Sequence, residues 1–348
     1  MSTYLEEILE QPEALKRLYR SAHNKTTLAE LARDYQSSRP QLLFVGMGSS
    51  HYAGHVIRSR LSRAHIPFRI EEAGEVLHYE FDGIDERTWI VAISQSGESY
   101  ETRELVKRAR GHVARIVSIT NEEQSTIASL ADHTLLLCAG EEQASSTKTY
   151  LNSLLALHQF VDAISGERFV TDETVQGLAD TLERTSPRLM TKMADVVNYL
   201  DISKEAHPQP IHMVARGPMF TTALQTALIL AETTDLFASA LPGGTFRHGP
   251  FELSGPEHRV VFFAPSGRTQ DIVTKMAKEV YTYGSKVVLL SDHAETFPFA
   301  HIPLPRISEH FAPLLYFLPM ELFGSSVALH RGRIPGTMKR MGKVTTME

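Results

Sequence analysis

Short runs of β-branched and aliphatic residues alternate along the chain with longer segments whose apolar residues recur at helical spacing. This alternation is typical of parallel sheets that are covered by helices. Strands in such sheets are buried on both faces, so each short apolar run is a candidate strand. In the first half of the chain the candidate strands are residues 41–46, 88–94, 115–120 and 133–138, and in the second half they are residues 211–217, 259–265, 286–292 and 301–305.

The two sets of candidate strands repeat at a nearly constant distance along the chain. Gly46 and Gly217 are 171 residues apart, and His133 and His301 are 168 residues apart. A single pair could arise by chance in any α/β chain, but runs that keep both order and spacing favour an internal duplication. We therefore predict two tandem, doubly wound α/β domains, each a flavodoxin-like three-layer sandwich around a parallel sheet.

Each half of the chain closes with a long apolar segment, residues 149–165 and 312–329, whose spacing predicts a core helix. A chain of 348 residues with 42% hydrophobic content is long enough for two domains of ordinary size. The expected organisation is an N-terminal helical segment (1–35), a first domain with the ligand site (36–185) and a second domain with a C-terminal active-site tail (186–348).

Composition argues against several classes of partner. A formal net charge of -6 and a sequence pI of about 6.2 do not suit general binding to nucleic acid or to an anionic membrane. No signal peptide and no apolar run near the ~20 residues of a membrane-spanning helix is evident, so we expect a cytoplasmic protein. The one cysteine, Cys138, ends an apolar run, and we expect it in the core rather than as a nucleophile.

A hydroxyl-rich loop follows the second candidate strand, in the sequence ISQSGESYET (93–102). Ser94, Gln95, Ser96 and Ser99 are neutral hydrogen-bond donors at a strand end that feeds a helix, where α/β sheets bind ligands and anions. The loop lacks the lysine of a nucleotide-binding P-loop, which favours a single phosphate monoester over ATP. A polar turn with good helix caps is the alternative interpretation of these residues alone.

Two further strand ends have the same character. GMGSSHYAG (46–54) contributes Ser49 and Ser50, and ASSTKTY (144–150) contributes Ser146. Three such ends of one sheet can converge on an anionic, hydroxylated ligand, which suggests a phosphorylated sugar. The corresponding loops of the second half, RGPMFTT and PSGRTQD, carry fewer hydroxyls, so we expect one ligand site per chain, in the first half.

At these motifs the chain resembles the sugar isomerase (SIS) domain family. MGSS, SQSGES and SSTK are similar to the family's CGTS, SQSGET and ASTK, and EILEQPEAL (7–15) to its opening helix. Residues 223–250 align without a gap on the family block ALEGALKLKE…GELKHGP, and the KVTTME tail is similar to KSVTVE. The resemblance covers nearly the whole chain. It is strongest to tandem-SIS proteins, namely the isomerase half of glucosamine-6-phosphate synthase and free-standing deaminases.

The resemblance implies a role for individual residues. Glu232 corresponds to the carboxylate that moves a proton between C1 and C2, His248 to the ring-opening histidine, and Lys343 to the tail lysine that forms a Schiff base with the ketose. These residue types suit those steps. The implied phosphate contacts are Ser94, Gln95, Ser96 and Ser99, and the implied sugar-hydroxyl contacts are Ser49, Ser50 and Ser146.

The chain also departs from the family pattern. Ile229 and Ala231 stand where the family block has two lysines, Gln225 stands for a glutamate, and Met47 for the cysteine of CGTS. The change at position 229 removes a cation near the implied reaction centre, so we expect the substrate or the nitrogen chemistry to differ. The chain begins at the opening helix, so no amidotransferase domain and no glutamine hydrolysis are expected.

The resulting expectation is a homodimeric isomerase or deaminase of an amino-sugar 6-phosphate, with His248 completing the site of the neighbouring subunit. A deglycase acting on a phosphorylated Amadori compound and a non-catalytic phosphosugar-binding regulator stay open as alternatives. We expect no cofactor and no metal. His51 and His55 have metal-ligand spacing, but no HExxH pattern accompanies them, which favours ordinary helix histidines.

Overall fold

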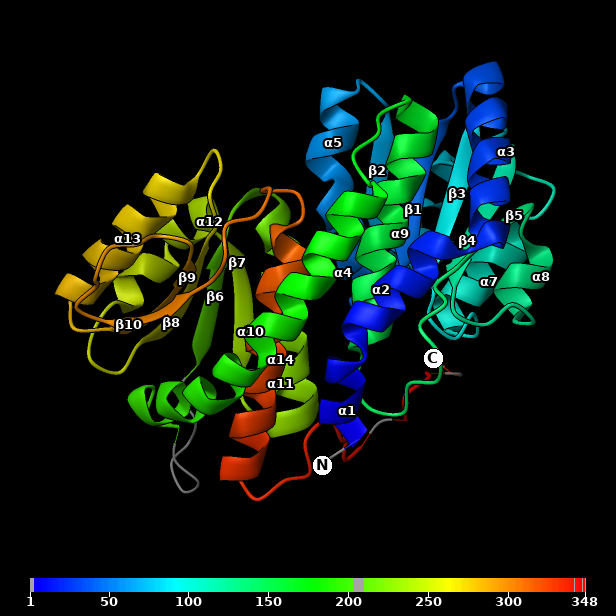
Figure 1. Ribbon diagram of the computed structural model, residues 1–348. Helices are drawn as coiled ribbons and strands as arrows, with labels where there is room; N and C mark the ends of the chain where they lie inside the picture. The colour runs from blue at the N-terminus through cyan, green and yellow to red at the C-terminus, as the bar shows by residue number, and fades with distance from the viewer. Residues whose placement is uncertain (1–2, 203–209, 341, 346, 348) are drawn as a thin grey trace. The chain divides into compact units, whose positions relative to one another are not determined.

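The computed structural model describes residues 3–202, 210–340, 342–345 and 347 (Figure 1). The chain divides into two compact units, each containing one parallel sheet. Unit A comprises residues 10–179 and 340–348, and unit B comprises residues 1–9 and 180–339. The C-terminal tail therefore belongs to the unit that holds the first half of the chain.

Sheet A, the sheet of unit A, has five parallel strands in the order β2-β1-β3-β4-β5. Its strands are β1 (Gln41–Gly46), β2 (Phe68–Glu72), β3 (Thr88–Ile93), β4 (Arg115–Thr120) and β5 (His133–Leu136). The central strand β3 is buried along its whole length because helices cover both faces of the sheet.

Two layers of helices enclose sheet A. One layer contains α2 (Gln11–Arg20), α3 (Ala22–Ser38), α4 (Ser49–Gly54), α5 (Arg58–Arg63) and α9 (Lys148–Ser165). The other contains α6 (Ala73–Glu75), α7 (Tyr100–Ala109) and α8 (Thr126–Leu130). The apolar residues of α7 recur every three to four positions, so Leu105, Val106 and Ala109 pack together against the sheet.

Sheet B, the sheet of unit B, repeats this topology with the order β10-β9-β8-β6-β7. Its strands are β6 (Ile211–Ala215), β7 (Ala238–Pro242), β8 (Arg259–Ala264), β9 (Lys286–Ser291) and β10 (Ala300–Pro303), all parallel. The two sheets therefore share one strand order, which confirms the tandem α/β fold predicted from the repeated strand pattern.

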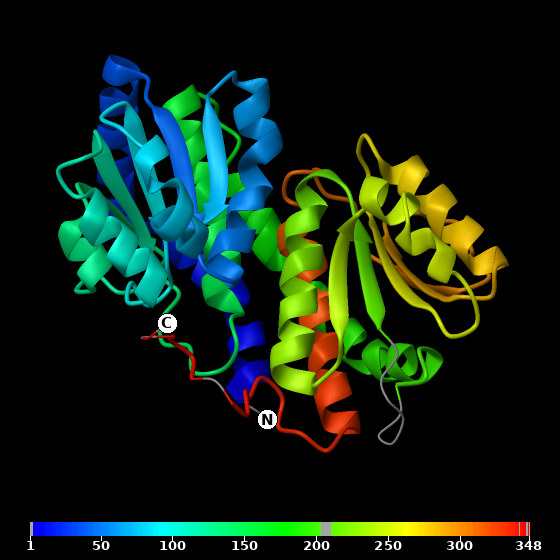
Figure 2. The same cartoon turned by 180° about the vertical axis from the view of Figure 1, so that it is seen from behind.

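Helices also cover both faces of sheet B (Figures 1 and 2). On one face lie α11 (Phe220–Thr234) and α14 (Ala312–His330), and on the other lie α12 (Gly243–Arg247) and α13 (Gln270–Thr282). The first helix, α1 (Thr3–Leu9), packs on α14. The long helix α10 (Asp172–Tyr199) contains the boundary of the two units, and the expected domain boundary at 185/186 falls within it.

The sequence located eight of the strands and missed β2 and β7. These two are the edge strands next to β1 and β6, and in each only one or no residue is fully buried. A half-exposed edge strand lacks the apolar run that marks a central strand, so the pattern gave no signal. The Gly- and Pro-rich sequence LPGGTFRHGP (241–250) favours a projecting loop, but these residues include the end of β7 and all of α12.

Three smaller expectations were wrong. The opening segment forms two helices, with Glu10 as the N-cap of α2 and Pro12 in the first turn of α2, a position where proline is favoured. Cys138 lies beyond the end of β5, is only half-buried and has a positive φ of 52°, so it is not a core strand residue. Contrary to the expectation that no apolar run approaches the length of a membrane-spanning helix, α14 is 19 residues long and apolar enough to cross a membrane by length and composition alone. Because 89% of its apolar window is buried, it is nevertheless the core helix predicted over residues 312–329.

Candidate functional site

The three hydroxyl-bearing loops follow β1, β3 and β5 of sheet A. In a parallel sheet the carboxyl ends of all strands lie at one edge, and there the loops of an α/β unit meet their ligands. Asn121, which follows β4, links the loop after β3 to the loop after β5 at this edge. Its backbone N–H donates to Gln95 O, and its side-chain amide donates to Gly140 O. The predicted binding residues of unit A therefore gather at the carboxyl edge of sheet A.

The loop after β3 is held in shape by its own hydroxyls. Ser94 is 1% exposed, and its hydroxyl accepts the N–H of Gly97 at 3.1 Å and donates to Ser99 Oγ at 3.3 Å. Ser96 Oγ accepts the N–H of Glu98 at 3.1 Å. Gln95, Ser96 and Ser99 are half-buried and keep accessible surface at the edge. Ser94 thus shapes the loop, while the other three side chains can reach a ligand.

Gly97 and Glu98 fasten this loop to the neighbouring one. Gly97 has a φ of +63°, and a Cβ at this position would lie 2.0 Å from Ser125 Oγ. The Glu98 carboxylate accepts the N–H of Thr126 at 2.6 Å and its hydroxyl at 2.9 Å, which caps the start of α8. Neither residue was among the predicted site residues, yet the glycine is required by the close approach of the two loops.

The loop after β1 is equally tight. A Cβ on Gly46 would lie 2.9 Å from Ile93 O, so only glycine lets β1 approach β3 here. Ser49 and Ser50 are half-buried in the first turn of α4. The rings of His51 and His55 lie 5.3 Å apart, and burial lowers the pKa of both, that of His55 to about 4. Both imidazoles are therefore neutral at pH 7.

The loop after β5 is built around Glu142, which the sequence analysis missed. Its side chain is fully buried and accepts four hydrogen bonds from Thr147 and Thr149, two from backbone N–H groups and two from hydroxyls. These bonds hold the turn that carries the half-buried Ser146. Two adjacent glutamates in a loop carry no spacing signal, so only the three-dimensional structure reveals this role.

The C-terminal tail lies on the same edge of unit A. Lys343 Nζ is 3.1 Å from Glu142 Oε2 and also donates to the main-chain carbonyl of Glu142. Thr345 O accepts the N–H of Tyr100, the first residue of α7, at 3.0 Å. The tail residues that the structure describes therefore bring Lys343 to the edge that carries Ser96, Ser99 and Ser146.

Glu232 lies in unit B, in the last turn of α11, and is half-buried. Gln225 and Ile229 precede it at helical spacing on the same side of α11. Ile229 is 1% exposed and packs on Gly324 of α14, where a Cβ would lie 3.4 Å from Ile229 Cγ2. Gln225 is fully buried, and its amide has no hydrogen-bond partner among the described residues. The position where the family block has a lysine is thus an apolar core position here.

His248 also lies in unit B, exposed directly after α12. Phe246, two residues earlier, is fully buried in a cluster with Val273 and Met276 of α13. Helix α12, directly before His248, packs with α13, whereas α11, which carries Glu232, packs with α14, so the two helices cover opposite faces of sheet B. Unit B therefore does not bring these two predicted catalytic residues together.

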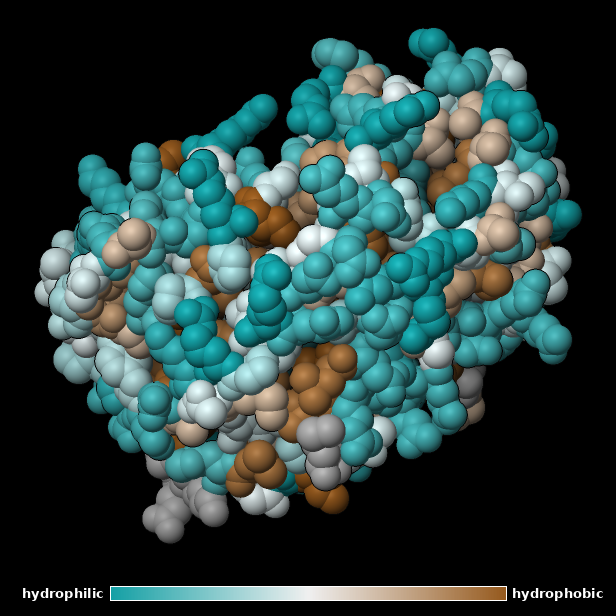
Figure 3. All heavy atoms as spheres, in the orientation of Figure 1, coloured by the Kyte–Doolittle hydropathy of each residue, from teal (hydrophilic) through white to brown (hydrophobic). Residues whose placement is uncertain are grey.

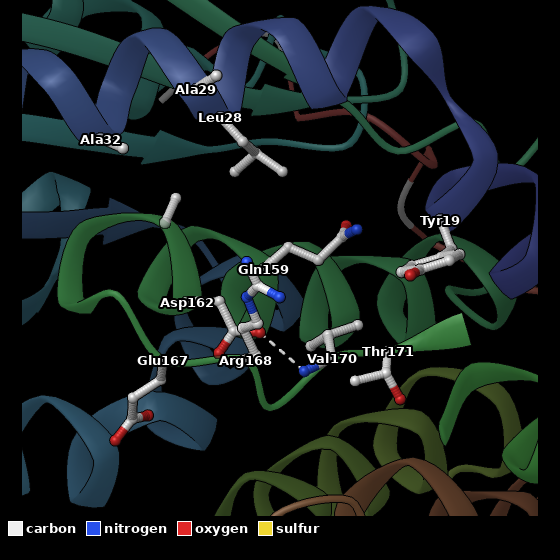
Figure 4. Close-up of a pocket in the computed structure, with 11 residues that line it drawn as sticks. Tyr19, Leu28, Ala29, Ala32, Gln159, Asp162, Glu167, Arg168, Val170 and Thr171 are labelled. Carbon is white, nitrogen blue, oxygen red and sulfur yellow. Dashed lines mark hydrogen bonds between the residues drawn. The ribbon is translucent and has the colours of Figure 1, made fainter. Parts of the chain in front are cut away.

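Two cavities lie elsewhere in the units. One, of about 490 Å³, lies between α3, α9 and the segment after α9 in unit A (Figure 4). Asp162 at its edge accepts the N–H of Val170 at 2.7 Å and pairs with the buried Arg60. The other, of about 460 Å³, lies in unit B and is lined by Ser266, Gly267 and residues 306–309. The described lining of neither cavity includes a predicted site residue.

Hydrophilic residues cover most of the visible face of unit A, with apolar residues between them in small groups (Figure 3). Within the described ranges of the chain, no three His, Cys, Asp or Glu side chains are grouped so that they could hold a metal ion. The carboxyl edge of sheet A offers hydroxyls, backbone N–H groups and the Lys343 ammonium, and the Arg17 guanidinium donates to the carbonyls of Cys138 and Ala139 in the loop after β5.

Comparison with known proteins identifies the family. The SIS domain model matches residues 35–163 and 206–297, which together make up more than half of the chain. The chain belongs to the SIS domain family. The matched segments fall mainly on the two sheets, which agrees with the duplicated topology.

Individual relatives agree in fold. The glutamine–fructose-6-phosphate aminotransferase (isomerizing) of Pyrococcus horikoshii is 29% identical over 353 residues, which cover 99% of this chain and 57% of that protein. The chain thus spans little more than half the length of this relative. The C-terminal domain of the Francisella tularensis glucosamine-fructose-6-phosphate aminotransferase matches with a TM-score of 0.82 and 23% identity over 97% of this chain and 98% of that chain. Glucosamine-6-phosphate deaminase of Thermotoga maritima matches with a TM-score of 0.75 and 23% identity over 99% of both chains.

Proposed function

We propose that this protein is a phosphosugar isomerase or deaminase that acts on an amino-sugar 6-phosphate by aldose–ketose chemistry of the glucosamine 6-phosphate to fructose 6-phosphate type. The proposal rests on the family membership and on the carboxyl edge of sheet A. The names of the relatives point in the same direction, since they include an aminotransferase of fructose 6-phosphate and a deaminase of glucosamine 6-phosphate.

One observation carries the proposal: an amine, Lys343, lies at the same edge as the half-buried hydroxyls of Ser96, Ser99 and Ser146. Hydroxyls and backbone N–H groups at the start of a helix bind a phosphate monoester. An amine nearby can capture the carbonyl of an open-chain ketose as a Schiff base. A regulator that only binds phosphosugars has no need of the amine.

Glu232 and His248 supply the remaining steps in this proposal. Glu232 moves the proton between C1 and C2, and His248 opens the sugar ring. Because α11 and α12 cover opposite faces of sheet B within one unit B, a site that uses both residues draws them from two chains. This separation supports the proposed homodimer, in which a two-fold axis produces two shared sites.

A second candidate, a deglycase of a phosphorylated Amadori compound, is favoured by the buried Ile229. The resembled synthases carry a lysine at this position, whereas here the side chain packs on Gly324. A changed charge next to the base can redirect the nitrogen chemistry, while Glu232 and His248 serve a deglycase equally well.

The direct test is a screen of purified protein against hexosamine 6-phosphates and fructosamine 6-phosphates, with ammonia, free amine and ketose phosphate measured separately. Ammonia with fructose 6-phosphate from glucosamine 6-phosphate is the expected result. Release of a free amino acid from a fructosamine 6-phosphate identifies the deglycase. Tight binding of phosphosugars without turnover of any of them contradicts both enzymatic proposals and identifies a regulator.

The shared site has its own test. Neither Glu232→Gln nor His248→Ala homodimers should turn over substrate, but a mixture after subunit exchange should regain activity toward half per heterodimer, since one site then has both residues. Exchange is verified with differently tagged subunits. Proven exchange without recovered activity contradicts the shared site and leaves a site completed within one chain.

A further inference from the structure

Glu142 is a carboxylate enclosed by the protein. Its side chain is fully buried, although burying an unpaired carboxylate costs several kcal/mol. Oε1 accepts the N–H of Thr147 at 2.9 Å, the hydroxyl of Thr147 at 3.0 Å and the N–H of Thr149 at 3.0 Å. Oε2 accepts the hydroxyl of Thr149 at 2.6 Å. These donors satisfy the first turn of α9, where a negative charge is also favoured by the helix dipole.

The fifth donor to this carboxylate comes from the other end of the chain. Lys343 Nζ lies 3.1 Å from Oε2 and also reaches the main-chain carbonyl of Glu142, and 21% of the Lys343 side chain is exposed. Two residues further on, the tail carbonyl of Thr345 accepts the N–H of Tyr100 at the start of α7. The tail is thereby fixed at two points, on the loop after β5 and next to the loop after β3.

We infer that Glu142 is the positioning residue for Lys343: its Oε2 holds the ammonium group at the carboxyl edge of sheet A, where the carbonyl of a bound open-chain sugar phosphate would lie. The identity of that carbonyl rests on the proposed function. The docking of the tail does not rest on the proposed function, because the contacts of Glu142 and Tyr100 define it.

The two carboxylate oxygens of Glu142 accept from different donors, so one substitution can act selectively on the bond between Oε2 and Lys343. In Glu142→Gln the amide oxygen can keep the place of Oε1, because two of its three donors are backbone N–H groups that cannot reverse. The amide NH₂ then takes the place of Oε2. The Thr149 hydroxyl can turn and accept from it, but the Lys343 ammonium has no lone pair to offer. The substitution should therefore remove the bond of Lys343 to Oε2, leave the lysine only its bond to the main-chain carbonyl of residue 142, and keep the turn of α9 in place.

The neighbouring residue provides a matched control. Glu141 is exposed, and the hydrogen bond that its carboxylate accepts comes from Gln143 on the surface. Glu141→Gln changes the net charge by the same amount one position away, without touching the tail. Any effect of charge alone should appear in both variants.

The first measurement is tryptic cleavage after Lys343, followed by mass spectrometry of the released tail. Loss of the buried pairing should speed this cleavage on the order of tenfold in Glu142→Gln, and leave it at the wild-type rate in Glu141→Gln. Cleavage after core residues such as Lys148 serves as the internal standard for global unfolding. Equal rates after Lys343 in all three proteins would overturn the inference, whether or not the protein binds a sugar.

The second measurement addresses the chemistry. Neutral Nζ, after its ammonium proton passes to water, forms a bond to C2 of fructose 6-phosphate. The carbonyl oxygen leaves as water, and added borohydride delivers hydride to the C=N bond and fixes the adduct. The yield of the Lys343 adduct should fall about tenfold or more in Glu142→Gln, with unchanged affinity for fructose 6-phosphate by calorimetry.

The possible outcomes separate the two proposals. A weaker affinity in Glu142→Gln with an unchanged adduct yield per bound ligand contradicts a positioning role and assigns Glu142 to the phosphate turn alone. No adduct and no binding in wild-type protein contradicts the proposed function, and the tryptic cleavage still decides whether Glu142 docks the tail. Faster tail cleavage together with a lower adduct yield at constant affinity supports the inference.

Discussion

The loop after β3 in unit A and the loop after β8 in unit B occupy the same place in two sheets of the same topology, but their donors are used differently. In unit A, Ser96 and Ser99 are half-buried at the edge, and the hydrogen bonds that their hydroxyls accept come from within the loop. In unit B, Ser266 donates both its N–H, at 2.9 Å, and its hydroxyl to the carboxylate of Asp292, and Gln270 donates to it at 2.6 Å. A protein carboxylate thus takes the donors that a phosphate would need.

The residue after the next strand decides this difference. Asn121 follows β4 and Asp292 follows β9, 171 residues later, in equivalent positions. The Asn121 amide turns to Ala139 and Gly140 and leaves the hydroxyl loop open. The Asp292 carboxylate faces the loop after β8 and accepts hydrogen bonds from its donors. A single difference, an amide in unit A and a carboxylate in unit B, therefore distinguishes a loop that can bind an external anion from a loop whose donors already bind a carboxylate of the protein.

The cavity in unit B extends this contrast. It is lined by Ser266 and Gly267, with Arg306 and Glu309 on the opposite side. A phosphate placed there would meet the Glu309 carboxylate as well as the Arg306 guanidinium, so the lining offers it both a repulsion and an attraction. The two sheets share one topology, but their corresponding loops offer a phosphate different groups, because function lies in the side chains of a site rather than in its fold.

The largest expected effect comes from Gly97→Ala. With a φ of +63° and a Cβ position 2.0 Å from Ser125 Oγ, the alanine must displace the loop from the start of α8. Calorimetry should then detect no binding of fructose 6-phosphate. The counterpart Gly267→Ala meets only the end of the Glu309 side chain, at 2.5 Å, so it should leave binding intact. Binding that survives in Gly97→Ala contradicts the loop as the phosphate site.

The next effect is that of Ser96→Ala combined with Ser99→Ala. Each hydroxyl removed from a charged acceptor should weaken sugar-phosphate binding by about 1.5–3 kcal/mol, and thermal melting should stay native. Ser266→Ala in the loop of unit B is the matched control, and it should leave affinity unchanged while lowering the melting temperature. If the control weakens binding as much as the double variant does, the site is not confined to unit A.

A smaller effect is expected when Asn121 of unit A is replaced by aspartate, the residue type that unit B has at the equivalent position, Asp292. Asn121→Asp should weaken sugar-phosphate binding by about 1–3 kcal/mol, the Coulomb energy of like charges several ångströms apart near a surface. Added salt should recover part of the loss, because ions screen a charge but do not repair a displaced loop. Affinity that falls equally at low and high salt would assign the loss to the broken bonds with Ala139 and Gly140 instead.

Much of this comparison could be predicted from the sequence. Apolar strand runs predicted the duplicated fold, because central parallel strands are buried on both faces, and the hydroxyls of 94–99 marked one loop as richer in donors than its counterpart. The family resemblance contributed the tail lysine. Whether these residues bind a phosphosugar is still a prediction.

The remainder depends on contacts between distant segments. The pairing of Glu142 with Lys343 joins residues 201 positions apart, and that of Ser266 with Asp292 joins residues 26 apart. No local pattern distinguishes Glu142 from Glu141, since their difference is burial. The edge strand β7 was missed for the related reason that its residues are only half-buried at the edge of the sheet and form no buried apolar run.

The smallest effect distinguishes the units by their response to acid. His212 Nδ1 lies 2.7 Å from His258 Nε2 inside unit B, and both rings pack on Phe246. Burial lowers the pKa of both, and together with the charge of His212 it lowers that of His258 to about 4. Unit A also holds a half-buried pair, His51 and His55, whose pKa values are lowered by burial, so variants of one pair are needed to separate the responses of the two units.

The direction in which stability changes with pH follows from these lowered pKa values. Between about pH 6.5 and pH 4 the histidines bind protons in the unfolded chain but not in folded unit B. The stabilisation of unit B by its neutral histidines is therefore complete above pH 6.5 and is lost progressively as the pH falls below 6.5. Lowering the pH from 6.5 to 5.5 should reduce the stability of unit B by about 1 kcal/mol. Hydrogen exchange should show β8 losing protection as the pH falls, and His258→Phe should remove most of that loss while leaving the loss at β3 unchanged. A loss at β8 that His258→Phe does not reduce would mean that the histidine pair does not govern the acid response of unit B.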